Sequence, residues 1–163
     1  MKGNVVRTIF VVAVLLSLSA VASAQSDRTC SNAGVAGAWG YSETGTLYLP
    51  TGAIPYASVG SYTLDADGNL SGARTASAGG TILTAVLKGS ATVNADCTGT
   101  LTIALYDQSG TLLNTVAKAV VYVDDARAAR AIITSVLLPN GASVPAVLTT
   151  DAKKLYPKRD GEQ

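Results

Sequence analysis

The chain has 163 residues, no histidine, two cysteines and a formal net charge of +1 at neutral pH. Without histidine, catalytic systems of the Ser-His-Asp and Cys-His kinds are excluded, and the common zinc and copper sites lose their usual ligand. No glycine-rich phosphate loop is present, and the nearly balanced charge gives no support for nucleic acid as a partner. We therefore expect no metal and no cofactor.

The N-terminal 24 residues have the pattern of a secretory signal peptide. Lys2 and Arg7 give the N-terminus positive charge, residues 9–21 form an apolar run, and small residues follow up to Ala24. The apolar run is too short for a comfortable membrane span, and a polar segment comes next. The sequence predicts cleavage after Ala24, a secreted or periplasmic protein, and no membrane span once residues 1–24 are removed.

The 139 residues after the signal peptide suffice for one domain, residues 25–150, followed by a charged tail at 151–163. This part carries ten basic and eleven acidic residues, so its formal charge is −1. It is rich in Thr, Ala, Gly, Val and Leu, which is a composition typical of β proteins.

Turn signals recur every ten to fifteen residues and divide the domain into eight expected strands. Short turns between consecutive strands favour antiparallel neighbours. We predict an all-β fold, an eight-stranded antiparallel up-and-down barrel, because closure removes exposed sheet edges. A two-sheet sandwich is the competing architecture. The expected strands are residues 36–48, 56–65, 69–77, 82–93, 98–106, 111–123, 127–138 and 142–150.

On the first expected strand, Trp39, Tyr41 and Glu43 share one parity, which we take as the inward face. A buried carboxylate is costly unless it is paired. Three readings follow: a structural ion pair with an arginine, a general acid or ligand anchor beside Tyr41, or an outward Glu43 caused by a bulge at Gly40 or Gly45. The arginines considered for the ion pair are Arg74, Arg127 and Arg130.

The segment after the second expected strand carries oxygen-bearing side chains at Asp65, Asp67 and Asn69, which invites a calcium-loop interpretation. An EF-hand loop requires Gly at its sixth position and Glu at its twelfth, where this chain has Leu70 and Ala76. A plain hairpin turn is therefore the favoured interpretation.

Strict alternation is clearest on the central strands, where apolar and polar residues take opposite faces. The candidates for lining the barrel interior, and any ligand held there, are Trp39, Tyr41, Tyr62, Leu101, Ile103 and Leu105. The outward positions of 82–93 and 98–106 are mainly Thr, Ser and Lys, which disfavours an outer-membrane barrel.

Two of the later strands lack a clear inward face. The 111–123 strand is apolar on both faces apart from Asn114 and Lys118, so it is a candidate contact with another chain. For 127–138 no inward face can be assigned, because Arg127 and Arg130 have opposite parity.

Several motifs resemble a known group of proteins. Gly37-Ala38-Trp39 resembles the Gly-x-Trp opening of lipocalin-type calycin barrels. Residues 30–32, 62–72 and 94–100 add to this a resemblance to exported bacterial proteins with an allene-oxide-cyclase-like barrel. The resemblance covers roughly residues 30–135 and implies a barrel with a Cys30–Cys97 disulfide, the state also typical of an isolated cysteine pair after export. It implies no activity.

We expect an exported small barrel that binds a small apolar molecule in its interior, and the missing catalytic motifs favour a non-enzymatic role. Two alternatives stay open. One is an isomerase or cyclase that uses Glu43 and Tyr41 inside the barrel, and the other is a structural or adhesive envelope module. The sequence does not indicate an oligomeric state.

Overall fold

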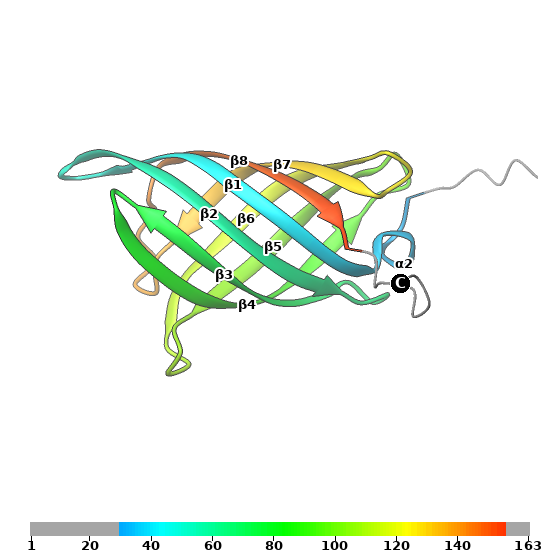
Figure 1. The fold of residues 1–163 in the computed structure, drawn as a ribbon, viewed down its shortest axis with the longest axis horizontal. Helices are drawn as coiled ribbons and strands as arrows, with labels where there is room; N and C mark the ends of the chain where they lie inside the picture. The colour runs from blue at the N-terminus through cyan, green and yellow to red at the C-terminus, as the bar shows by residue number, and fades with distance from the viewer. Residues whose placement is uncertain (1–29, 156–163) are drawn as a thin grey trace, which may run out of the picture.

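The structure, a computed structural model, describes residues 30–155; the predicted signal peptide, its cleavage site and residues 156–163 lie outside this range. Eight antiparallel strands pair in chain order and close into one barrel, with β1 also paired to β8 (Figure 1). The predicted barrel is therefore confirmed, and the sandwich is excluded. The strands are β1 (Gly37–Leu49), β2 (Gly52–Leu64), β3 (Asn69–Ala78), β4 (Thr81–Val93), β5 (Thr98–Tyr106), β6 (Leu112–Val123), β7 (Ala128–Leu137) and β8 (Ala146–Lys154).

Alternating burial produces the core. On β5, Leu101, Ile103 and Leu105 are buried, whereas Thr100 and Thr102 are exposed. The same alternation on the other strands directs apolar side chains into the barrel, where burial of each stabilises the fold by about 1.5–3 kcal/mol. The interior is thus mainly a packed core, and any site inside the barrel is built from its few polar members.

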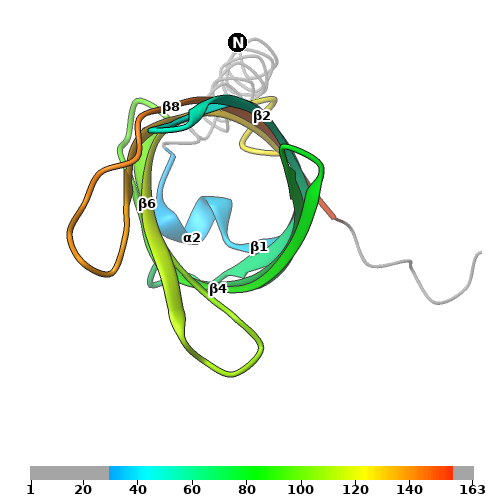
Figure 2. The same cartoon turned by 90° about the vertical axis from the view of Figure 1, so that its left-hand side faces the viewer.

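One end of the barrel is closed by the segment before β1 (Figure 2). This segment contains α2 (Asn32–Val35), a single helical turn capped by Ser31, whose hydroxyl accepts from the Gly34 amide. The indole of Trp39 is fully buried and donates to the Val35 carbonyl at 3.0 Å. The turn was not predicted, because four residues are too few to show a helical period.

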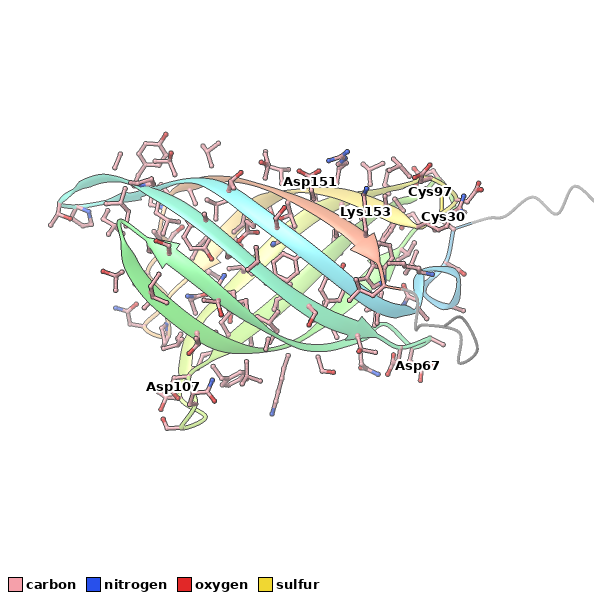
Figure 3. The ribbon with its side chains drawn as sticks, viewed as in Figure 1. Cys30, Asp67, Cys97, Asp107, Asp151 and Lys153 are labelled. Carbon is pink, nitrogen blue, oxygen red and sulfur yellow. A yellow bond between two sulfur atoms is a disulfide. The ribbon has the colours of Figure 1, made fainter. Side chains whose placement is uncertain are left out.

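Cys30 and Cys97 form a disulfide that fixes this closing segment to the turn between β4 and β5 (Figure 3). The predicted pairing is therefore confirmed. Because the β4–β5 turn lies at the same end of the barrel as α2, the bridge anchors the segment before β1 at the end where Trp39 is buried.

The ladder between β7 and β8 is the shortest in the barrel, with five residue pairs from Ala128↔Lys153 to Ile132↔Thr149. Beyond it, a bulge places Thr134 outside the β6–β7 register, so the inward parity changes between Ile133 and Val136. The chain between β7 and β8 returns as a loop at the end opposite α2.

Several strand boundaries differ from the prediction, most of them by one residue. β2 begins four residues earlier than expected, at Gly52, because its ladder with β1 runs up to the tight turn after Leu49. β8 begins and ends four residues later than expected, because Thr150 and Ala152 continue an inward alternation through the charged stretch. Arg127 belongs to the turn before β7, and both it and Arg130 are exposed, which removes the conflict of parity. No helix within residues 30–155 has the length and apolar character needed to cross a membrane.

Candidate functional site: a charge cluster inside the barrel

Glu43 points into the barrel and is only 2% exposed, as the parity of β1 predicted. Its partner is Lys118 of β6, itself 6% exposed, whose ammonium donates to Glu43 Oε2 and to Thr150 Oγ1, the latter at 2.9 Å. The Thr150 hydroxyl donates in turn to Glu43 Oε2 at 2.8 Å. The three side chains form a closed triangle that compensates the cost of burying both charges.

Arg74 of β3 adds a second positive charge to the cluster. Its Nη1 lies 4.0 Å from Glu43 Oε1, and its guanidinium carbon lies 5.7 Å from the centre of the Tyr56 ring. Of the three arginines considered from the sequence, Arg74 is the one beside Glu43. Arg127 and Arg130 instead form exposed ion pairs outside the barrel, with Asp125 and Asp151 respectively.

Two of the hydroxyl groups near the cluster, on Tyr56 and Ser58, have no hydrogen-bond partner among the described residues. Ser58 lies directly opposite Glu43 in the β1–β2 ladder, and Thr150 lies opposite Glu43 on the other side. Tyr56 Oη and Ser58 Oγ are both buried. Buried polar atoms of folded proteins are normally paired, so each such atom needs an explanation. Asn114 Oδ1, on β6, is buried and unpartnered as well.

An aromatic layer separates the cluster from the closed end. Trp39 stacks on Tyr62 with ring centres 6.3 Å apart, and the ring centres of Tyr62 and Tyr41 lie 5.9 Å apart. Lys118 Nζ lies 5.6 Å from the centre of the Tyr41 ring, a cation–π distance. Burial raises the pKa of the Tyr41 and Tyr62 phenols well above the ordinary value of 10.0, so both stay neutral near pH 7.

A small cavity of about 20 Å³ lies between this aromatic layer and Lys118. Tyr41, Tyr62, Leu101 and Ile103 line it, so four of the six predicted interior residues meet there; Trp39 and Leu105 are buried in the core but do not line the cavity. This volume suits one water molecule and no larger ligand. Lys118 and Thr150 supply its polar wall.

The end opposite α2 is more exposed. Leu83 shares the inward parity of Ala85 and Leu87 on β4, yet it is 46% exposed while those two are buried. It lies opposite Ala76, which lies opposite Ser58 and hence in line with Glu43. An inward apolar side chain that reaches solvent at this level marks the mouth of the barrel. Leu47 and Ile54, also half-buried, belong to the same end.

Lys118 and Thr150 were not among the predicted site residues. Lys118 carried a signal, since it shares parity with Val116 and Val120 in an otherwise apolar strand and therefore had to point inward with them. Thr150 carried none, because it fell at the predicted end of the last strand.

No group of three or more potential metal-ligating side chains gathers anywhere in residues 30–155. The segment considered for calcium is a hairpin turn: Asp65 Oδ1 accepts from the backbone amides of Asp67 and Asn69, and Asp65 Oδ2 accepts from the Asn69 side chain. These bonds use both carboxylate oxygens within the turn itself.

No protein-family model matches the sequence, and no curated protein shows significant similarity to it. The fold and the site together define a closed, disulfide-linked eight-stranded barrel with a buried charge cluster.

Proposed function

We propose that the chain is an exported, non-enzymatic barrel that binds a small, mostly apolar molecule through the end opposite α2. The observation that carries this proposal is the difference between the two ends. One end is closed by Trp39, α2 and the disulfide, whereas inward apolar side chains reach solvent at the other. Ligand sites in proteins are mostly apolar and contain a few polar groups, and both kinds of residue are present here.

The ligand would occupy the mouth and not the deep interior. The cavity beside Tyr41 holds one water at most, so it excludes a larger guest. At the mouth, Leu47, Ile54 and Leu83 offer apolar contacts, and the charge cluster lies behind them. A ligand bound in this position would bury apolar surface, which stabilises the complex by about 25 cal/mol per Å². The ion pair of Lys118 would stay intact.

Matched arginine substitutions at the mouth test this proposal. Leu83 and Ile82 are adjacent and exposed, but Leu83 has inward parity and Ile82 has outward parity. We expect Leu83→Arg to abolish binding of ligands recovered with the protein from its own host, measured by native mass spectrometry, and Ile82→Arg to preserve it. Repeated absence of any bound mass in the unaltered protein would refute ligand binding.

Export and a calycin-like identity belong to the same proposal. The signal pattern of residues 1–24 supports export, and a disulfide is compatible with an extracellular or periplasmic location. Mass measurement of the protein secreted by its host should give a chain that begins at Gln25. Retention of the first 24 residues would contradict the proposal.

The enzymatic alternative has less support. A general acid needs a proton to donate towards a substrate, but Glu43 Oε2 accepts hydrogen bonds from both Lys118 and Thr150. The raised pKa of Tyr41 likewise disfavours a phenolate base. The structural-module alternative draws on the exposed outward residues Val121 and Val123 of β6, and light scattering at high concentration would detect the resulting self-association.

A further inference from the structure

We infer that the ligand of the proposed mouth site carries one negative charge, a carboxylate, which Arg74 binds with help from Tyr56 and Ser58. This inference rests on the proposed function and specifies its ligand class.

The first step is the balance of charge. Lys118 and Arg74 bring two positive charges to the cluster, and Glu43 brings one negative charge. No other charged side chain of residues 30–155 forms an ion pair with these three. The interior therefore carries a net charge of +1 in a poorly solvated setting, where unbalanced charge is costly. A monoanion neutralises the cluster, whereas a cation would add to the repulsion.

The second step is the balance of hydrogen bonds. Lys118 donates to both Glu43 and Thr150, but Arg74 lies 4.0 Å from Glu43 Oε1, beyond hydrogen-bond distance, so its guanidinium donates no hydrogen bond to the carboxylate. Tyr56 Oη and Ser58 Oγ, both on side chains more than nine-tenths buried, also have hydroxyl protons to donate. Arg74, Tyr56 and Ser58 lie beside one another, and the five N–H donors of the guanidinium exceed the acceptors that the two hydroxyls offer. A carboxylate supplies up to four acceptor sites for these donors.

The third step is access. Arg74 is 13% exposed, compared with 7% for the side chain of Lys118 and 2% for that of Glu43. A ligand from solvent would thus meet Arg74 before the other two. Tyr56 and Ser58 lie on β2, adjacent to β3, which carries Arg74. The arginine and both hydroxyls belong to neighbouring strands, so the three groups can bind one carboxylate together. Leu83 on β4 would contact the apolar part of the ligand.

Calorimetry with matched probes tests the inference. Octanoate and octan-1-ol have equal chain length but differ in charge, and acetate has the charge without the chain. We expect octanoate to bind at least about 10-fold more tightly than octan-1-ol, because charge-assisted hydrogen bonds are about twice as strong as neutral ones. We also expect acetate to bind more weakly than octanoate. If acetate bound with equal affinity, the ligand would need no apolar part, and the site would be one for small anions.

The variant Arg74→Met should remove the difference between octanoate and octan-1-ol, while Arg130→Met, on the outer face, should preserve it. If Arg74→Met does not fold, the double variant Tyr56→Phe with Ser58→Ala keeps the charges and should weaken octanoate several-fold without affecting octan-1-ol. If octanoate and octan-1-ol bound equally well, the inference of a carboxylate ligand would be wrong, while the proposed function would still hold. If neither probe binds, the mass of a host-derived ligand decides: an anion supports the inference, a neutral molecule overturns it, and no ligand refutes the proposed function as well.

Discussion

Lys118 of β6 and Glu43 of β1 form an ion pair across the barrel interior, although β7 and β8 lie between their strands. The two intervening strands share the shortest ladder, with five residue pairs. Thr150, on β8, joins the same triangle of hydrogen bonds. The ion pair thus links the strands on either side of the weakest seam, and it contributes to closure as well as to the proposed site.

Replacement of Lys118 by Met should destabilise the protein by about 3–5 kcal/mol, because Glu43 would keep its buried charge and lose its closest cation. The double variant Lys118→Met with Glu43→Leu should be less destabilised than the single variant, since no buried charge loses its partner. Urea unfolding of the oxidised protein measures both free energies.

Arg130→Met is the control for this experiment. The Arg130–Asp151 ion pair lies on the outer face, with both side chains more than half exposed, so its loss should cost about 0–1 kcal/mol. A Lys118→Met variant as stable as this control would show that the interior pair contributes little to closure.

Loss of the disulfide should lower the free energy of unfolding by about 4 kcal/mol, because the bridge closes a loop between residues 67 positions apart. The double variant Cys30→Ser with Cys97→Ser can be compared with the unaltered protein in urea, with and without reductant. We expect the reductant to destabilise the unaltered protein to the level of the variant and to leave the variant unchanged. A variant as stable as the oxidised protein would contradict this account.

Much of the fold could be predicted because alternation and turns are local properties. Leu101, Ile103 and Leu105 reveal their shared face within one strand, and the same parity placed Glu43 inside. The prediction fails where the pairing register between strands departs from the local alternation of residues. The bulge at Thr134 changes the inward parity of β7, and nothing in the residues around it signals an extra position.

The candidate site was less accessible to prediction, since it depends on which strands face one another across the barrel. Parity shows that Glu43 and Lys118 both point inward, but their contact depends on strand tilt and closure. The arginine choice shows the same limit: Arg74 and Arg130 were equally available to Glu43 from the sequence, and only the register separates the inner one from the outer one.

The protein should lose stability in acid, partly through its hairpin turns. The Asp107 carboxylate accepts from the Ser109 hydroxyl and from the amides of Thr111 and Ser109, and these bonds lower its pKa below the ordinary 3.8. A lowered folded-state pKa means that the stabilisation is complete above the unfolded value and is lost as pH falls through the folded one. Urea midpoints should therefore decrease below about pH 4.

The variant Asp107→Asn tests this assignment, because it removes the titrating group and keeps the side-chain shape. Its unfolding midpoint should be lower than that of the unaltered protein at pH 7 and should change less with pH in the acid range. NMR titration of the carboxyl carbon would give the pKa directly. A value at or above 3.8 for Asp107 would be inconsistent with the turn hydrogen bonds.

Gly60 of β2 should tolerate no side chain, because the barrel interior is filled around it. A Cβ there would lie 2.8 Å from Tyr41 Cε1 and 2.5 Å from the Ala73 carbonyl oxygen. We expect Gly60→Ala to destabilise the protein by about 1–3 kcal/mol in urea unfolding, since overpacking forces side chains and backbone to move. Gly40→Ala is the matched control on β1: its Cβ would meet only the flexible end of Leu155, at 3.1 Å, and should cost less than about 1 kcal/mol. Equal stability of the two variants would mean that the interior near Tyr41 has room to adjust, and hence space for a ligand deeper than the mouth.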